Sequence, residues 1–173
     1  MASLIFYSST DGHTRKIAEA MAQQWRGPVQ VAPLADFADW RGDDKIHCVV
    51  IGASIRYGHF QDELIKTVRK NKNWLNERQT GFFGVNLTAR KVGRSDPASS
   101  PYMQKFLRVS GWRPDHLALF AGKLDYPTYR FFDKTMIRLI MKMTGGCADG
   151  TSTIVYTDWQ EVTNFSRAVS GSD

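Results

Sequence analysis

Residues 4–14 read Leu4-Ile5-Phe6-Tyr7-Ser8-Ser9-Thr10-Asp11-Gly12-His13-Thr14. The apolar start predicts a short buried strand, and apolar side chains at helical spacing from Ile17 to Trp25 predict a helix that ends at Gly27-Pro28. The loop between them is rich in hydroxyl groups. Free N–H groups and the positive end of the helix dipole suit a phosphate dianion, and hydroxyls add donors without adding charge. The stretch therefore predicts a strand–loop–helix unit that binds phosphate.

This loop matches neither of the two common nucleotide-binding motifs. It lacks the Gly-Lys-Ser/Thr of a Walker loop and the Gly-x-Gly-x-x-Gly of a dinucleotide fingerprint. The alternative interpretation is an ordinary helix-capping turn, because Ser, Thr and Asp are favoured there. A cap needs one such side chain, whereas this loop has several, so we favour the phosphate site.

Apolar strand patterns and amphipathic helix patterns alternate along the chain. Extended runs are predicted at 4–7, 29–31, 46–52, 81–87 and 117–122, with helices after the first, third and fourth and a last helix capped by Asp158. This alternation predicts an α/β fold with a doubly wound parallel sheet in a single domain over residues 1–173. Ligands of such sheets bind beyond the carboxyl ends of the strands, so the loops after the first, third and fourth strands are the candidate site.

Residues 123–150 interrupt this alternation, and an extended run follows them at 154–157. At 100° per residue one side of the predicted helix is basic and the opposite arc is apolar. The basic stripe comprises Arg130, Lys134, Arg138 and Lys142; the apolar arc comprises Phe132, Met136, Leu139, Ile140 and Met143. The segment could be a core-facing helix with a solvated back, a helix that lies on anionic lipid, or a roof over a bound ligand.

Composition narrows the class of protein. The 173 residues carry 23 Lys+Arg against 17 Asp+Glu, a net charge of +6, and 42% of them are hydrophobic, which fits a globular core. Two distant cysteines, no membrane-spanning run and no leader pattern predict a cytoplasmic protein. The four histidines fit no metal-ligand spacing, and no nucleic-acid recognition motif accompanies the positive charge, so we expect neither a metal nor a nucleic-acid partner.

Three loops resemble those that hold FMN in flavodoxins, and residues 3–168 resemble one flavodoxin-like branch, the quinone-dependent protoporphyrinogen oxidases of bacterial haem synthesis. The resemblance is carried by Ser8–Thr14, Ala53–His59, Asn86–Lys91, Trp112-Arg113-Pro114, Leu139–Met143 and Val155–Trp159. It implies a five-stranded sheet of order 2-1-3-4-5 and FMN as cofactor. The residues that it implies for FMN are Ser9, Thr10, Asp11, Gly12, His13, Thr14, Ser54, Tyr57, Gly58, Asn86, Leu87, Thr88 and Ala89.

Two of these residues carry a more detailed expectation. Asp11 departs from the usual flavodoxin Thr-Gly-x-Thr loop, so its carboxylate is expected to point outward or to cap a backbone N–H. Tyr57 is a candidate to stack on the flavin ring, and the alternative for it is a buried loop aromatic.

The resemblance also implies the reaction: oxidation of protoporphyrinogen IX to protoporphyrin IX with a membrane quinone, ubiquinone or menaquinone, as electron acceptor. The flavin would perform the hydride chemistry, so no catalytic side chain is assigned. Arg56, Arg90 and Lys91 are candidates to meet the substrate propionates, and the basic stripe is a candidate contact with an anionic membrane surface, with the protein on the inner face of the cell membrane. The alternatives are a flavodoxin-type electron carrier, an NAD(P)H:quinone reductase and a regulatory module with an empty site.

Overall fold

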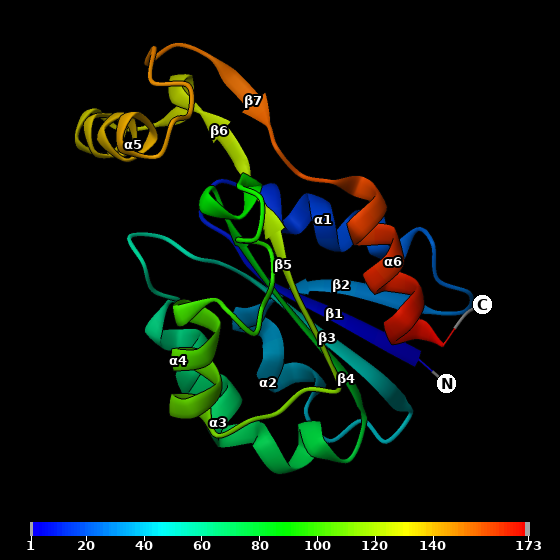
Figure 1. Cartoon of the computed structure of the whole chain (residues 1–173). Coiled ribbons are helices and arrows are strands. Elements are labelled where there is room, and N and C mark those ends of the chain that lie inside the picture. The colour runs from blue at the N-terminus through cyan, green and yellow to red at the C-terminus, as the bar shows by residue number, and fades with distance from the viewer. Residues whose placement is uncertain (1, 172–173) are drawn as a thin grey trace.

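The computed structural model describes residues 2–171 and contains a parallel five-stranded sheet of order β2-β1-β3-β4-β5 (Figure 1). Its strands are β1 (Ala2–Ser8), β2 (Val29–Pro33), β3 (Ile46–Ser54), β4 (Gln79–Asn86) and β5 (His116–Ala121). The expected fold class and strand order are confirmed. The direction of the strand order changes at β1, because β2 lies on one side of it and β3 on the other. Such a switch point places a crevice at the carboxyl ends of β1 and β3.

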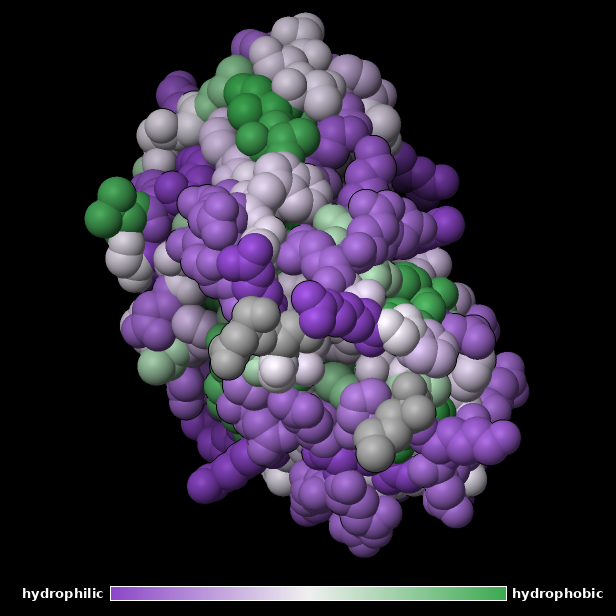
Figure 2. Space-filling model, turned by 90° about the vertical axis from the view of Figure 1, so that its right-hand side faces the viewer, coloured by the Kyte–Doolittle hydropathy of each residue, from purple (hydrophilic) through white to green (hydrophobic). Residues whose placement is uncertain are grey.

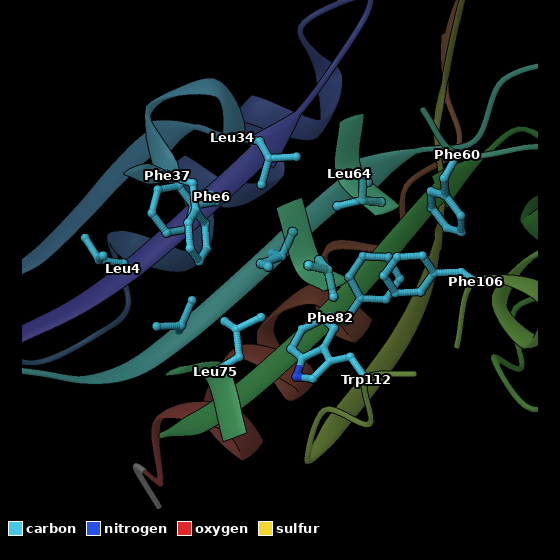
Figure 3. Packing of buried hydrophobic residues seen from close by; sticks show 14 of the residues in the cluster. Leu4, Phe6, Leu34, Phe37, Phe60, Leu64, Leu75, Phe82, Phe106 and Trp112 are labelled. Carbon is cyan, nitrogen blue, oxygen red and sulfur yellow. The ribbon is translucent and has the colours of Figure 1, made fainter. Parts of the chain in front are cut away.

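Helices cover both faces of this sheet. On one face, α1 (His13–Ala22) and α6 (Trp159–Ser170) pack their apolar sides against the strands. The other face is covered by α2 (Phe37–Trp40), α3 (Asp62–Asn76) and α4 (Pro101–Ser110). There the aromatic rings of Phe82, Phe106 and Trp112 pack together with Leu75 (Figure 3). This core holds the strand ends, and therefore the loops that follow them, in fixed positions.

The predicted end of the first helix was wrong. α1 ends at Ala22 rather than at Gly27, and Trp25 lies beyond the helix although it remains buried. The indole Nε1 of Trp25 donates to the backbone oxygen and to the hydroxyl of Ser166 on α6. Trp25 therefore keeps the inward position that the periodicity indicates, because α6 rather than a further helical turn holds it there.

The segment that interrupts the alternation forms a separate unit at one end of the sheet (Figure 1). It contains β6 (Lys123–Asp125), a 3-10 turn (Tyr126–Thr128) and α5 (Phe131–Met143), and β6 pairs antiparallel with β7 (Thr153–Val155). We call residues 123–155 the insertion. Leu124, Tyr126, Ile137 and Met141 form its own small core. The extended run after the break thus belongs to this two-stranded ribbon and not to the main sheet.

Helix α5 is not an ordinary core-facing helix. Ile137 and Met141 are its buried residues, whereas Phe131, Phe132, Met136, Leu139 and Met143 are exposed. Large apolar side chains that gather on a surface helix indicate contact with a ligand or a partner. The core-facing interpretation of this segment is therefore wrong.

The last helix begins as predicted, because the Asp158 carboxylate accepts hydrogen bonds from the backbone N–H groups of Gln160 and Glu161. Its side of the molecule is largely hydrophilic, and one of the hydrophobic patches on it lies toward the end that carries the insertion (Figure 2). Among residues 2–171, no helix combines the length and the apolar character that crossing a membrane requires.

Candidate functional site

A cavity of about 720 Å³ opens at the carboxyl ends of the strands. Its walls are the loops after β1, β3 and β4, and α5 of the insertion lies against it. A volume of this size is typical of small-molecule and cofactor sites. This cavity therefore lies where the switch point predicts a ligand.

The loop after β1 leaves the N-terminus of α1 open. Gly12 is the N-cap residue with φ 78°, and no side chain caps the helix. The Ser8 hydroxyl is directed elsewhere, since it donates to the Gln61 side chain 2.9 Å away. The interpretation of this loop as an ordinary capping turn is therefore wrong. Its free N–H groups remain available to an anion, as a phosphate site requires.

Two buried polar atoms of residues that line the cavity have no partner among the described residues: Ser54 Oγ and His13 Nδ1. The other nitrogen of His13, Nε2, lies 2.6 Å from Thr157 Oγ1. The Thr157 hydroxyl donates its one hydrogen to the carbonyl oxygen of Ala121, so His13 Nε2 is the donor in this pair and Nδ1 carries a lone pair. Buried polar groups in native proteins normally have a partner, so these two atoms indicate a ligand with hydrogen-bonding groups.

Burial lowers the pKa of His13, and the positive charges of Lys123 and Lys16 lower it further. A depressed pKa means that the folded state favours the neutral ring. Above the unfolded-state pKa of about 6.5 the ring is neutral in both states, and His13 costs the folded state no stability. As the pH falls from there toward the lower folded-state pKa, the unfolded state binds a proton that the folded state does not, so the folded state loses stability.

We therefore expect the free energy of unfolding of the ligand-free protein to fall as the pH is lowered below about 6.5, and the variant His13→Gln to show a shallower fall. Urea unfolding at several pH values measures both, with His116→Gln as the control for loss of an imidazole elsewhere. Equal pH slopes for the parent protein and His13→Gln would contradict this assignment.

The loop after β3 presents Tyr57 on a tight turn. The backbones of Arg56 and His59 exchange two hydrogen bonds, and both residues between them have positive φ, 51° for Tyr57 and 81° for Gly58. A left-handed conformation is uncommon for tyrosine and marks a position that its surroundings hold in place. Tyr57 is 50% exposed, so the interpretation of it as a buried loop aromatic is wrong.

Charged groups surround this turn. The Arg56 guanidinium contacts Asp11 at 3.4 Å and Asp133 of α5 at 3.0 Å. The Asp11 carboxylate thus points toward the Arg56 guanidinium. The positive charge of Arg56 offsets part of the negative charge that Asp11 brings to the loop after β1. Asp133 also accepts a hydrogen bond from the Tyr57 hydroxyl, and this bond raises the pKa of Tyr57.

The loop after β4 corrects three expectations, those for Ala89, Arg90 and Lys91. The Asn86 carboxamide oxygen accepts from the N–H of Ala89 at 2.8 Å, and Ala89 is buried away from the cavity. Arg90 donates to the Leu87 carbonyl at 2.6 Å and to the Thr144 hydroxyl at 2.8 Å. Its guanidinium therefore joins this loop to the end of α5 and does not face the cavity. Lys91 is exposed and also lies off the cavity.

Helix α5 turns its apolar arc toward the cavity. Met136, Ile137, Ile140 and Met143 are among the lining residues, whereas none of the four residues of the basic stripe is. Arg138 instead donates from Nε to the Ala148 carbonyl within the insertion. A roof over the cavity would thus be apolar, and the basic side of the helix faces away from it.

The structure brings together most of the residues expected to hold a cofactor. Eleven of them line the cavity: Ser9, Thr10, Asp11, His13, Thr14, Ser54, Tyr57, Gly58, Asn86, Leu87 and Thr88. Gly12 and Ala89 do not line the cavity. Of the three cationic candidates in the loops, Arg56, Arg90 and Lys91, only Arg56 lines it. Within residues 2–171, no three His, Cys, Asp or Glu side chains meet as a metal site would require.

Sequence reasoning missed several residues of the cavity wall: Ile55, Val85, Tyr102, Gly122, Lys123, Tyr129, Ile137 and Thr144. Lys123 had a signal, because it follows the fifth strand and belongs to the same edge of the sheet as the candidate loops. Tyr102 had none in the sequence. It reaches the site from the first turn of α4, where its ring lies beside Gly58.

Comparisons with known proteins agree with this geometry. Residues 4–151 match the model of the flavodoxin domain family. The protoporphyrinogen IX dehydrogenase (quinone) of Escherichia coli strain K12 is 43% identical over 98% of this chain and 94% of its own. The protein of the same name from Leishmania major is 42% identical over 94% of this chain and 71% of its own.

Solved structures with this fold include flavodoxins. A flavodoxin from the domain Archaea superposes with a TM-score of 0.55 at 15% identity, over 99% of this chain and 97% of its own. Oxidised flavodoxin 2 from Bacillus cereus gives the same TM-score and identity over the whole of both chains. At such low identity these structures establish the fold alone.

Proposed function

The chain belongs to the flavodoxin domain family and, within it, to the quinone-dependent protoporphyrinogen IX dehydrogenases, and from this we propose that it oxidises protoporphyrinogen IX with a quinone as electron acceptor. The observation that carries the proposal is the match to relatives of that name over nearly the full length of both chains. The positive net charge also favours it over an electron carrier, since a substrate with carboxylates is attracted to a basic protein.

We propose FMN as the cofactor, because the loop after β1 presents the open N-terminus of α1 at the cavity, an arrangement that suits the one phosphate of FMN. The residues that would hold it are the eleven expected ones that line the cavity, with Gly12 as the N-cap beside them. Ser54 Oγ and His13 Nδ1, buried without partners, would then be satisfied by ligand groups. FMN supplies the hydride chemistry when bound.

The chain's own residues orient the reactants and exclude water. Tyr57 presents a half-exposed ring at the cavity, suited to packing against a planar ligand. Arg56 places a positive charge at the same wall, where it offsets negative charge on a ligand. Met136, Ile140 and Met143 present an apolar surface that excludes water and suits a flat, largely hydrophobic macrocycle.

We propose further that the single domain acts at the cytoplasmic face of an anionic membrane. The basic stripe points away from the cavity, and Phe131, Phe132 and Leu139 are exposed on the same helix. A helix with one basic face and large apolar side chains exposed on another is the pattern of a helix that lies in a lipid interface. This placement would bring the cavity close to the membrane in which a quinone such as ubiquinone or menaquinone dissolves.

Purified protein that contains FMN should reduce a quinone rapidly when protoporphyrinogen IX is supplied and negligibly when NADPH replaces it. Absorbance of the quinone and fluorescence of the porphyrin product measure the two sides of the reaction. Efficient reduction by NADPH without porphyrinogen oxidation would support an NAD(P)H:quinone reductase instead. Failure to react with quinone, combined with electron exchange with redox proteins, would support a flavodoxin-type carrier.

A further inference from the structure

Asp133, in the first turn of α5, uses both of its carboxylate oxygens on one loop of the main domain. Oδ2 lies 3.0 Å from Arg56 Nη2, and Oδ1 accepts a hydrogen bond from the Tyr57 hydroxyl. The side chains of Arg56 and Asp133 are 26% and 27% exposed, so this ion pair is shielded more than an ordinary surface pair. One residue of the insertion thus contacts two of the side chains that the loop after β3 offers to the cavity, Arg56 and Tyr57.

The opposite end of α5 is attached by a different residue. Arg90 joins the Leu87 carbonyl to the hydroxyl of Thr144, which follows the last turn of α5, and its guanidinium lies 5.5 Å from the Tyr156 ring centroid. Both loops beyond β3 and β4 are therefore tied to α5, one at each end. Between these ends Met136 and Ile140 line the cavity, so the two attachments set how this apolar face lies over the ligand site.

The attachments differ in character. The Arg90 contacts are to a backbone carbonyl and a threonine hydroxyl within the packed end of the insertion, where Leu87 and Tyr156 join its core. Those of Asp133 are to two side chains at the edge of the cavity, and one of them, Tyr57, is held in a left-handed conformation. The Asp133 contacts are therefore made between side chains outside the insertion core, whereas the Arg90 contacts lie beside that core.

We propose that Asp133 is a positioning residue: it fastens the N-terminal end of α5 to Arg56 and Tyr57, so that the apolar face of α5 closes the cavity and the Tyr57 ring is held in place for the flavin. The second half of this statement rests on the proposed function; the fastening itself does not.

Trypsin measures the fastening in the flavin-free protein, because the basic stripe places its cleavage sites along α5. We expect Asp133→Ala and Arg56→Gln each to speed cleavage after residues 130–142 by about five-fold, the effect of a part-buried ion pair with a hydrogen bond. The double variant should add little, because both changes remove the same contact. Glu63→Gln, an exposed carboxylate on α3, is the control for net charge.

Arg56→Gln leaves the first turn of α5 unchanged, so it separates loss of the attachment from loss of a favourable charge at a helix N-terminus. Additive effects of the two substitutions, or cleavage rates equal to the Glu63→Gln control, would overturn the proposal.

The coupling to the flavin is measured by release of bound FMN, followed through its fluorescence. Asp133→Ala and Tyr57→Phe should each speed release several-fold, again without adding in the double variant, and Asp133→Asn should fall between parent and alanine because its amide oxygen still accepts from Tyr57. The visible circular dichroism of bound FMN should change in Asp133→Ala. Unchanged release and dichroism, with faster cleavage, would overturn the positioning role. Absence of FMN binding in the parent protein would overturn the proposed cofactor, and trypsin would still decide the fastening.

Discussion

Thr10→Glu is expected to weaken FMN binding by about a thousandfold. A carboxylate placed about 4 Å from a phosphate charge near a protein surface costs about 4 kcal/mol, which corresponds to that factor. Thr10 lines the cavity but is exposed, so the longer side chain should not disturb the core. Titration of flavin fluorescence with the purified flavin-free protein measures the dissociation constant.

Thr10→Gln is the matched control, because it has nearly the same size as glutamate and no charge. Its affinity should stay within about ten-fold of the parent, since it loses one hydroxyl contact. Thr14→Glu should abolish binding as well, but Thr14 is 1% exposed, so that variant also buries a carboxylate and its fold must be checked. Tight FMN binding by Thr10→Glu would show that the loop after β1 is not the phosphate site.

Replacement of Arg130, Lys134, Arg138 and Lys142 together by glutamine should reduce binding to anionic vesicles by about a thousandfold. Each cation gains about 1 kcal/mol near an anionic surface, so the four contribute about 4 kcal/mol. Burial across the bilayer is excluded for this stretch, because each charge costs a few kcal/mol at the midplane. Vesicle sedimentation measures the effect; high salt should release the parent protein, and neutral vesicles should bind it poorly.

The variant Arg130→Lys/Arg138→Lys keeps all four charges and is the matched control. Because the basic stripe lies off the cavity, the glutamine variant should keep its activity with a water-soluble quinone. Undiminished vesicle binding by it would contradict the membrane role. Lost activity with the soluble quinone would instead assign these cations to the substrate.

The sequence alone determined the fold class, and it indicated the loops that line the cavity. Strand and helix periodicities differ, and parallel strands separated by helices have few possible arrangements, so the alternation was sufficient. The hydroxyl-rich loop before α1 was also recognisable, because the groups that suit an anion there are neighbours in the sequence. The break at 123–150 was visible too, because its pattern does not continue the alternation.

The tertiary structure decided which side chains reach the cavity. Arg56 and Arg90 occupy similar places after successive strands, yet one lines the cavity and the other donates to Leu87 and Thr144. The orientation of α5 was equally undetermined, because an amphipathic pattern fixes which side chains share a face but not what that face contacts. Asp133 had no signal at all: its partner Tyr57 lies 76 residues away and Arg56 lies next to Tyr57, so only the packing of the insertion against the main domain brings them together.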